Sequence, residues 1–346
     1  MDRCGAGWLS LPPPDPLAGL TAAPVRANSH FGTQLENNSE ISIEVLDCKQ
    51  HSREGEHVFP YLALTLRSLL EVYRYLGKWD KRERNRPVET EILRNNLVAR
   101  GYSSVHISAA LERLQTAADT TGVTPYQANL RTYQLLRYGV EVAIAAGRPH
   151  ETVHLVDWEH PEANDFALAE EVTLRGGYDR RPDLVLYVNG IAMAVIELKR
   201  SSVEVTDGIR QLITNQEEIF NKEFFSTVQF LFAGSDSQGL RYGTVTSREE
   251  FFVEWKAAAV AGPPATGALL DRPLAEMCDK ARLLDLVRNC ILFDNGIKEG
   301  AASAPVCGSE SRAGAHKEAR RRGDLAYAGQ RQEHPDGDAG QVAAGA

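Results

Sequence analysis

The chain has 346 residues, 43% of them hydrophobic, which is enough for one large or two ordinary domains with a sizeable core. Its 38 lysines and arginines stand against 47 aspartates and glutamates, and the net charge of -9 excludes a whole-chain attraction to nucleic acid or acidic membranes. No apolar run approaches the ~20 residues needed to cross a bilayer, and the N-terminus does not resemble a signal peptide. We therefore expect neither export nor membrane insertion.

The five cysteines are odd in number, far apart, and form no C-x-x-C pair. This spacing argues against a disulfide framework and against a zinc site. A reducing, cytoplasmic location is the expectation that follows.

Residues 1–60 mix Pro, Gly, Ser and Asn with little periodicity and are predicted to be a poorly defined N-terminal segment. Beyond them the spacing of apolar residues becomes helical. Pro87 is well placed to open a helix. Helices are expected at Leu62–Leu76, Pro87–Leu97, Ser104–Ala118 and Pro125–Leu136.

The loop between the first two of these helices, Lys78–Arg86, mixes both charge signs around Trp79. Such a loop could touch a phosphate backbone, but a solvated loop is the more ordinary interpretation.

After Leu136 the apolar period changes to two, which predicts strands. A helix, Asp207–Phe220, is expected between the last two strands, and together these elements predict an α/β domain with a mixed sheet flanked by helices, over residues 61–297. Residues 298–346 have almost no large aliphatic side chains and are predicted to be a disordered tail. The expected strands are Thr152–Trp158, Ala167–Leu174, Asp183–Val188, Ile191–Lys199 and Thr227–Phe232.

Two apolar strands that end in charges form the central feature of the sequence. Asn189-Gly190 between them is a strong hairpin signal, so Asp183 is expected near Glu197. A tight two-residue turn would pair Asp183 with Ile196 and put Glu197 on the opposite face. We therefore predict a three-residue loop with a glycine bulge, or an equivalent bulge, which sets Asp183 across from Glu197.

Two carboxylates converging with the Leu198 carbonyl would make an all-oxygen site suited to Mg²⁺. Such a metal lowers the pKa of a bound water and neutralises charge on a scissile phosphate, while Lys199, two residues from Glu197 on the same face, can orient the water or stabilise the transition state. The alternative is a surface hairpin whose terminal Asp, Glu and Lys only form ion pairs, because E-x-K alone occurs by chance in many strands.

The segment RPDLVLYVNGIAMAVIELKRS, Arg181–Ser201, resembles the PD-(D/E)xK nuclease motif of type I restriction enzyme R subunits. Further likeness to that family's N-terminal domain covers about Tyr73–Lys298. The resemblance implies a restriction-endonuclease-like fold, with Asp183 and Glu197 as metal ligands and Lys199 as the catalytic lysine.

The resemblance implies roles for two more residues. The family tends to carry Gln-x-x-x-Tyr on the next helix, near the substrate; Gln211 matches the glutamine, but Asn215 stands at the tyrosine position. Glu89 matches a family glutamate that approaches the metal, although a helix-capping carboxylate is the alternative.

In the family, two ATP-driven helicase domains follow the nuclease domain. The chain has no G-x-x-x-x-G-K-[ST] after residue 300, so ATP is expected only in a full-length enzyme. Read one base later, the codons of Gly329–Pro335 permit Gly-Ser-Gly-Lys-Ser-Ile, which resembles the family's phosphate-binding motif. We therefore expect residues 298–346 to be an out-of-frame tail of a truncated R subunit.

The resemblance further implies double-stranded DNA as substrate, and modification (methyltransferase) and specificity subunits as partners. Two other readings stay open: a non-catalytic DNA-binding or assembly module, and a stand-alone repair nuclease that uses the same motif.

Overall fold

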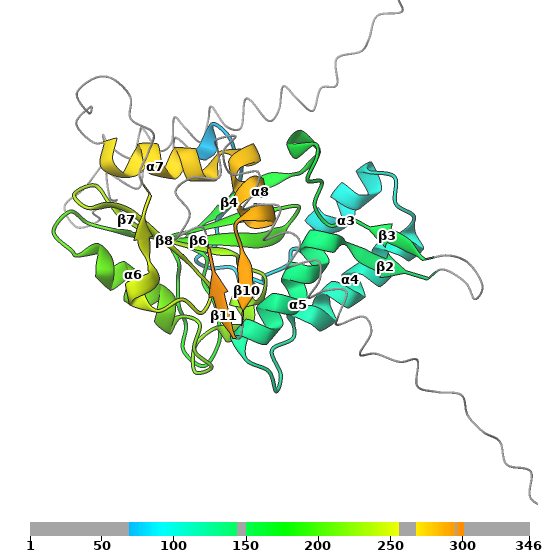
Figure 1. Ribbon diagram of the computed structural model, residues 1–346, viewed down its shortest axis with the longest axis horizontal. Coiled ribbons are helices and arrows are strands. Elements are labelled where there is room, and N and C mark those ends of the chain that lie inside the picture. Colours follow the sequence, from blue (N-terminus) through cyan, green and yellow to red (C-terminus); the bar gives the residue numbers. More distant parts are fainter. Residues whose placement is uncertain (1–68, 144–149, 256–267, 295, 301–346) are drawn as a thin grey trace, which may run out of the picture.

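The computed structural model describes residues 69–143, 150–255, 268–294 and 296–300. Its centre is a seven-stranded mixed sheet in the order β1-β4-β5-β6-β7-β8-β9, with helices packed on it (Figure 1), so the predicted α/β class with a mixed sheet is confirmed. The strands of this sheet are β1 (Arg74–Lys78), β4 (Phe166–Glu170), β5 (Leu184–Val188), β6 (Ile191–Lys199), β7 (Phe230–Ser235), β8 (Gly239–Thr244) and β9 (Val253–Glu254).

The middle of the sheet combines both kinds of strand pairing. β4, β5 and β6 pair antiparallel, whereas β6 and β7 pair parallel. A parallel pair needs a crossover connection, and helix α6 (Val205–Thr214) supplies it. β1 joins β4 in parallel at one edge, and β7, β8 and β9 continue antiparallel to the other.

The two faces of the sheet bury different helices. One apolar core joins the sheet to five helices, and the other joins it to α6 and the 3-10 turn η2 (Lys222–Ser226). In Figure 1, α7 and α6 lie on opposite sides of the strands. We call the second face the α6 face. The five helices of the first are α3 (Thr90–Ala99), α4 (Ser104–Ala118), α5 (Pro125–Tyr138), α7 (Ala268–Cys278) and α8 (Lys280–Asn289).

Local sequence signals explain where two of these helices begin. The Ser103 side chain accepts a hydrogen bond from the His106 amide at the start of α4. At the start of α5, Thr124 and Gln127 form a reciprocal capping box, with Pro125 in the first turn. Both predicted starts are confirmed.

Several predicted boundaries are wrong. The helix expected through Leu76 gives way to β1, which pairs with β4. Pro87 does not open a helix, because its carbonyl accepts a hydrogen bond from Ala192 and the next residue bridges to Ile191. The strand expected through Leu174 ends at Glu170, where the following residue has a φ of 45°.

Other elements are shorter than predicted or were not predicted. α6 ends at Thr214 rather than Phe220, and β8 was not predicted. The strand expected over Thr152–Trp158 is a three-residue strand of a separate small sheet. The remaining short elements are β2 (Val140–Val142), β3 (Glu151–Val153), η1 (Pro161–Ala163), η3 (Glu249–Phe251), β10 (Leu292–Asp294) and β11 (Ile297–Glu299).

The described fold extends past residue 297, where the tail was expected to begin. β11 pairs with β10, and Lys298 is buried with its ammonium group donating to Asn129 Oδ1, Gln229 Oε1 and the Gln229 carbonyl. Burial lowers the pKa of Lys298 well below its usual value. The segments predicted to be loose were 1–60 and 298–346, and all of their residues except 298–300 lie outside the described residues.

Two further expectations concern cysteines and membranes. Cys278 is a buried free thiol. Within the described part of the chain, no helix combines the length and the apolar character needed to cross a bilayer.

Candidate nuclease site

The hairpin of β5 and β6 turns tightly at Asn189-Gly190. Val188 pairs with Ile191 directly across the turn, and Asn189 and Gly190 have φ angles of 52° and 76°. Two consecutive positive φ angles are the signature of the favoured two-residue hairpin turn. The three-residue loop predicted at this position is therefore wrong.

An equivalent bulge, the other form that the sequence analysis allowed, lies inside β6. Tyr187 pairs with Ala192, whereas Leu186 pairs with Ala194, so Met193 has no partner on β5. One extra residue shifts the pairing by one. The last pair is Leu184 with Ile196, and Asp183 lies one residue further, across from Glu197.

The bulge also decides which face carries the charges. Val185 and Val195, two residues inward from Asp183 and Glu197, both pack in the α6 core. Side chains two apart on a strand share a face, so Asp183, Glu197 and Lys199 all lie on the α6 face. Met193 and Ala194, consecutive in the chain, both pack in the opposite core, as a bulge requires.

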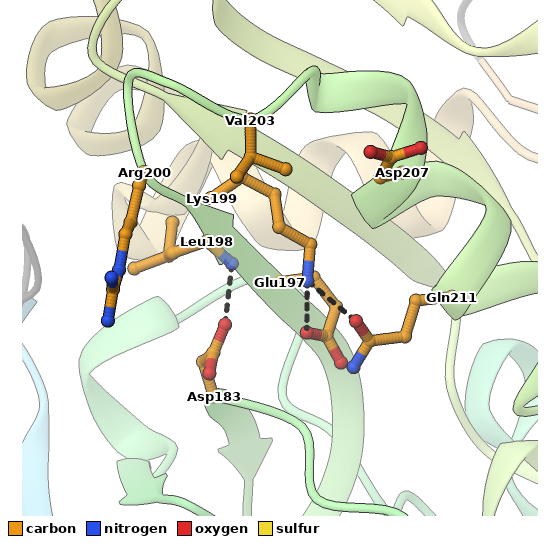
Figure 2. A pocket seen from close by; sticks show the side chains of 8 residues that line it. All are labelled: Asp183, Glu197, Leu198, Lys199, Arg200, Val203, Asp207 and Gln211. Carbon is orange, nitrogen blue, oxygen red and sulfur yellow. Dashed lines mark hydrogen bonds and ion pairs between the residues drawn. The ribbon is translucent and has the colours of Figure 1, made fainter.

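The acidic and basic groups converge closely at this end of the hairpin (Figure 2). Asp183 Oδ2 accepts a hydrogen bond from the Leu198 amide at 2.6 Å, and Lys199 Nζ lies 3.7 Å from Glu197 Oε2. On the other side, Lys199 Nζ donates to Gln211 Oε1 at 2.6 Å. The lysine is thus held between a strand carboxylate and a helix amide.

Gln211 reaches Lys199 because α6 crosses directly over β6. A Cβ atom at Gly208 would lie 3.3 Å from Lys199 Cε, so the helix packs against the lysine side chain without room to spare. Asn215, the C-cap residue directly after α6, is fully buried, and its side-chain oxygen and nitrogen have no hydrogen-bond partner among the described residues.

Burial dominates the electrostatics of the two carboxylates. Glu197 is 1% exposed, and desolvation, with the Asp183 charge second, raises its pKa well above the usual value. Desolvation also raises the pKa of Asp183, partly offset by the Leu198 amide and the Lys199 ammonium group. The positive charge near the two carboxylates is therefore too small to offset the cost of burying them.

The site opens into a cavity of about 400 Å³. Asp183, Glu197, Lys199 and Gln211 all line it, as Figure 2 shows. Three other lining residues were not predicted from the sequence: Arg200, Val203 and Asp207. A signal existed for two of them, because Arg200 directly follows Lys199 and Asp207 lies in the first turn of α6.

The structure does not bring Glu89 to this cavity, where the resemblance had implied an approach to the metal. Arg82 holds its carboxylate with two hydrogen bonds of 2.9 and 2.7 Å. The Glu89 amide donates to the Gly190 carbonyl, at the turn end of the hairpin, and the carboxylate does not line the cavity. The alternative, a carboxylate at the start of a helix, agrees with the structure: Glu89 is the N-cap residue of α3, although its side chain makes no capping hydrogen bond.

The residues present fit a small divalent cation. Glu197 Oε1 is buried and has no hydrogen-bond partner among the described residues, which leaves an acceptor for a cation. The Leu198 carbonyl points to the same edge of β6 as its amide, toward Asp183. No cluster of three or more His, Cys, Asp or Glu occurs in the described ranges, so the donors are two carboxylates and main-chain oxygen, a set that suits Mg²⁺.

Residues 68–251 match the family described as type I restriction enzyme R protein N terminus. The chain belongs to this family. The match covers more than half of the chain and contains the whole β5–β6 hairpin and α6, so the family resemblance carried by the sequence motifs is confirmed.

Three similar proteins are named endonuclease subunits of type I restriction enzymes. The type I restriction enzyme HindI endonuclease subunit of Haemophilus influenzae is 31% identical over 176 residues, 48% of this chain and 16% of that protein. The putative MjaIXP and MjaVIIIP endonuclease subunits of Methanocaldococcus jannaschii are 30% and 26% identical over 132 and 169 residues. These cover 36% and 46% of this chain, but only 12% and 15% of the relatives. The chain therefore matches only a small portion of each of these much longer proteins.

Proposed function

We propose that the chain is the endonuclease part of a type I restriction R subunit and hydrolyses phosphodiester bonds of double-stranded DNA with Mg²⁺. The observation that carries this proposal is the convergence of Asp183, Glu197 and Lys199 on one face, beside a cavity. An accidental surface hairpin would leave its terminal charges in solvent, whereas Glu197 is almost fully buried. Burying a carboxylate with one oxygen that has no hydrogen-bond partner costs stability and needs a function to explain it.

The fold supports the same proposal. A mixed sheet with two acidic residues at one end of an antiparallel hairpin, followed by a crossover helix, is the arrangement that the family resemblance implied. We assign it to the restriction-endonuclease-like class on this basis.

Each residue has a distinct part in the proposed reaction. Asp183 and Glu197, with the Leu198 carbonyl, would hold Mg²⁺, which supplies a Lewis acid for the phosphate and an acidified water. Lys199 would orient the attacking water and stabilise the negative charge that builds on the phosphate. Gln211 holds the lysine ammonium group toward Glu197 and would keep it aimed at the reacting atoms.

The wider system is also part of the proposal. The relatives are named endonuclease subunits of type I restriction enzymes, and each is several times longer than the matched segment. We infer that cleavage is ATP-dependent in the full-length enzyme, in the cytoplasm, with modification and specificity subunits as partners and the specificity subunit reading the DNA target.

A plasmid-nicking assay tests the proposal. The purified chain should convert supercoiled DNA to nicked and linear forms in Mg²⁺, and not in EDTA. Asp183→Asn and Glu197→Gln, which keep the side-chain size, should each remove the activity. Metal-indifferent DNA binding without nicking would instead favour a non-catalytic module, and efficient cutting of branched or damaged DNA over intact duplex would favour a repair nuclease.

A further inference from the structure

A second cleft, of about 640 Å³, lies away from the nuclease cavity. Three chain segments form most of its wall: the 83–87 part of the charged loop, the glycine-rich stretch 174–177, and residues 218–224 after α6. The charged loop, for which the sequence left phosphate contact and a solvated loop as alternatives, thus faces a defined cleft.

The cleft is connected to the nuclease site through the main chain. Beyond β4 and β5 the pairing continues: the Glu171 amide donates to the Asp183 carbonyl, and Leu174 bridges to Arg180. Arg180 is three residues from Asp183 in the chain, and Arg175, Gly176 and Gly177 of the cleft wall lie between Leu174 and Arg180.

Four cationic side chains line the cleft, from three different segments. Arg84 and Arg86 are exposed and form no ion pair with any described residue. Arg175 and Lys222 pair with Asp179 at 3.0 Å and with Glu218 at 3.6 Å. Ion pairs with a partner this exposed contribute little, so an incoming phosphate can replace either carboxylate.

Three glutamates, Glu83, Glu218 and Glu223, line the same cleft. All three are exposed, so solvent and salt screen their charge and their side chains can turn outward. The cationic groups are therefore the ones that a bound polyanion would draw into the cleft.

We call the turn between Leu174 and Arg180 the hairpin tip, and close packing holds it in place beside the cleft. Cβ atoms at Gly176 and Gly177 would come within 1.8 and 2.3 Å of the Phe220 and Ile219 carbonyl oxygens, so only glycine permits this approach. Asn221 Nδ2 donates to the Tyr178 carbonyl at 3.3 Å. This packing holds the hairpin against the segment that follows α6.

An aromatic side chain stands exposed on this tip. Tyr178 is 65% exposed, its ring centroid lies 5.8 Å from that of Phe220, and Ile219 beside it is 55% exposed. The Arg180 guanidinium group covers Phe220 at 3.9 Å. Cationic groups interleaved with an exposed aromatic ring on a fixed loop fit a nucleic-acid strand better than a free anion, because the ring can pack on sugars and bases.

We propose that this cleft binds the phosphate backbone of the substrate DNA to one side of the scissile phosphate. Arg84 and Arg86 contact phosphates there, and Tyr178 packs against a sugar or base at the rim. The inference rests on the proposed function for the identity of the substrate.

Binding of a fluorescein-labelled DNA duplex, followed by anisotropy without divalent cations, tests the proposal independently of cleavage. The double variant Arg84→Ala/Arg86→Ala should bind more weakly, and the slope of log affinity against log salt should become shallower by about 2. The matched control is Arg94→Ala/Arg113→Ala, which removes the same charge from α3 and α4 outside the cleft and should bind as the wild type does.

Tyr178→Ala provides a second, non-electrostatic measurement. It should weaken binding about ten-fold without changing the salt slope, because stacking releases no counterions. Thermal unfolding of each variant checks that the fold is intact.

The outcomes separate this inference from the proposed function. DNA binding through the cleft without any Mg²⁺-dependent nicking would contradict the proposed nuclease function and support the proposed binding surface. Equal affinity and equal salt slope in the two double-arginine variants would overturn the cleft proposal alone.

Discussion

Asp183 lies across from Glu197 even though the turn that joins their strands has only two residues. That turn alone would set Asp183 opposite Ile196. The register is different because Met193 has no partner on β5, which shifts β6 by one residue relative to β5. The two carboxylates are thus aligned because one residue in the middle of β6 stays out of the pairing with β5.

Deleting Met193 should leave the site in place. The remaining residues of β6 keep their partners, so Asp183 still faces Glu197, whereas a double deletion of Met193 and Ala194 moves Glu197 to the position opposite Leu184, on the other face. We expect the single deletion to lose about 2–5 kcal/mol of stability with the buried methionine but to keep Mn²⁺ binding.

Calorimetric titration of both deletion variants with Mn²⁺ measures this, with circular dichroism as the control for folding. A folded single-deletion chain that no longer binds Mn²⁺ would contradict the register described for β5 and β6.

Lys199 and Gln211 should differ in their effect on cleavage. Lys199→Met removes the charge that stabilises the transition state, so the rate should fall by about 100–1000-fold. Gln211→Ala leaves the charge and removes only its hydrogen-bonded support, so a loss of about ten-fold is expected. Single-turnover nicking rates at saturating Mg²⁺ measure both, and a loss with Gln211→Ala as large as with Lys199→Met would show that the glutamine has a part of its own in the chemistry.

Addition of Mg²⁺ should reverse which of the two proteins, the wild type or Glu197→Gln, is the more stable. In EDTA the variant should unfold at a higher temperature than the wild type, since it replaces a buried carboxylate that has an oxygen without a partner. Mg²⁺ at 100 times its dissociation constant should then stabilise the wild type by about 2.7 kcal/mol and the variant hardly at all. Differential scanning calorimetry of the two proteins decides; equal stabilisation by Mg²⁺ would place the cation elsewhere.

Lys298 should make stability depend on alkaline pH. Burial lowers its pKa in the folded chain, and its three acceptors are neutral oxygens that offset the burial only in part. Between this lowered pKa and the ordinary value of about 10.4, the unfolded chain binds more protons, so stability rises with pH across that window.

The measurement is urea unfolding of the wild type and of Lys298→Met between pH 7 and pH 10. As pH rises, the free energy of unfolding of the wild type should increase relative to that of Lys298→Met. Methionine cannot be protonated, and the other titrating groups are the same in both proteins, so their contributions cancel. A difference that is independent of pH would mean that the lysine is charged in the folded state throughout.

The candidate site was largely predictable because its signals are local. Asn189-Gly190 between two apolar runs predicted the hairpin, and E-x-K on one strand face fixed the relation of Glu197 to Lys199. The need for a one-residue bulge followed from the register of the charges. Its place at Met193 could not be predicted, because neither glycine nor a turn residue marks it and the shift is set by packing on both faces of the sheet.

The errors in the fold have a common cause, which is tertiary pairing that overrides local pattern. Arg74–Lys78 reads as the end of a leucine-rich helix, yet it pairs with β4 as an edge strand. Glu89 sits near a helix start in sequence, but the bidentate Arg82 contact that removes it from the site depends on how the charged loop folds back.

Binding of one Mn²⁺ ion tests the central claim most directly, because it does not require the chain to cut DNA by itself. Titration followed by electron paramagnetic resonance should give one bound Mn²⁺ per wild-type chain, displaced by Mg²⁺, and none at the same concentrations in Asp183→Asn or Glu197→Gln. Unchanged Mn²⁺ binding in both variants, or no binding by the folded wild type, would contradict a metal-dependent nuclease site between these two carboxylates.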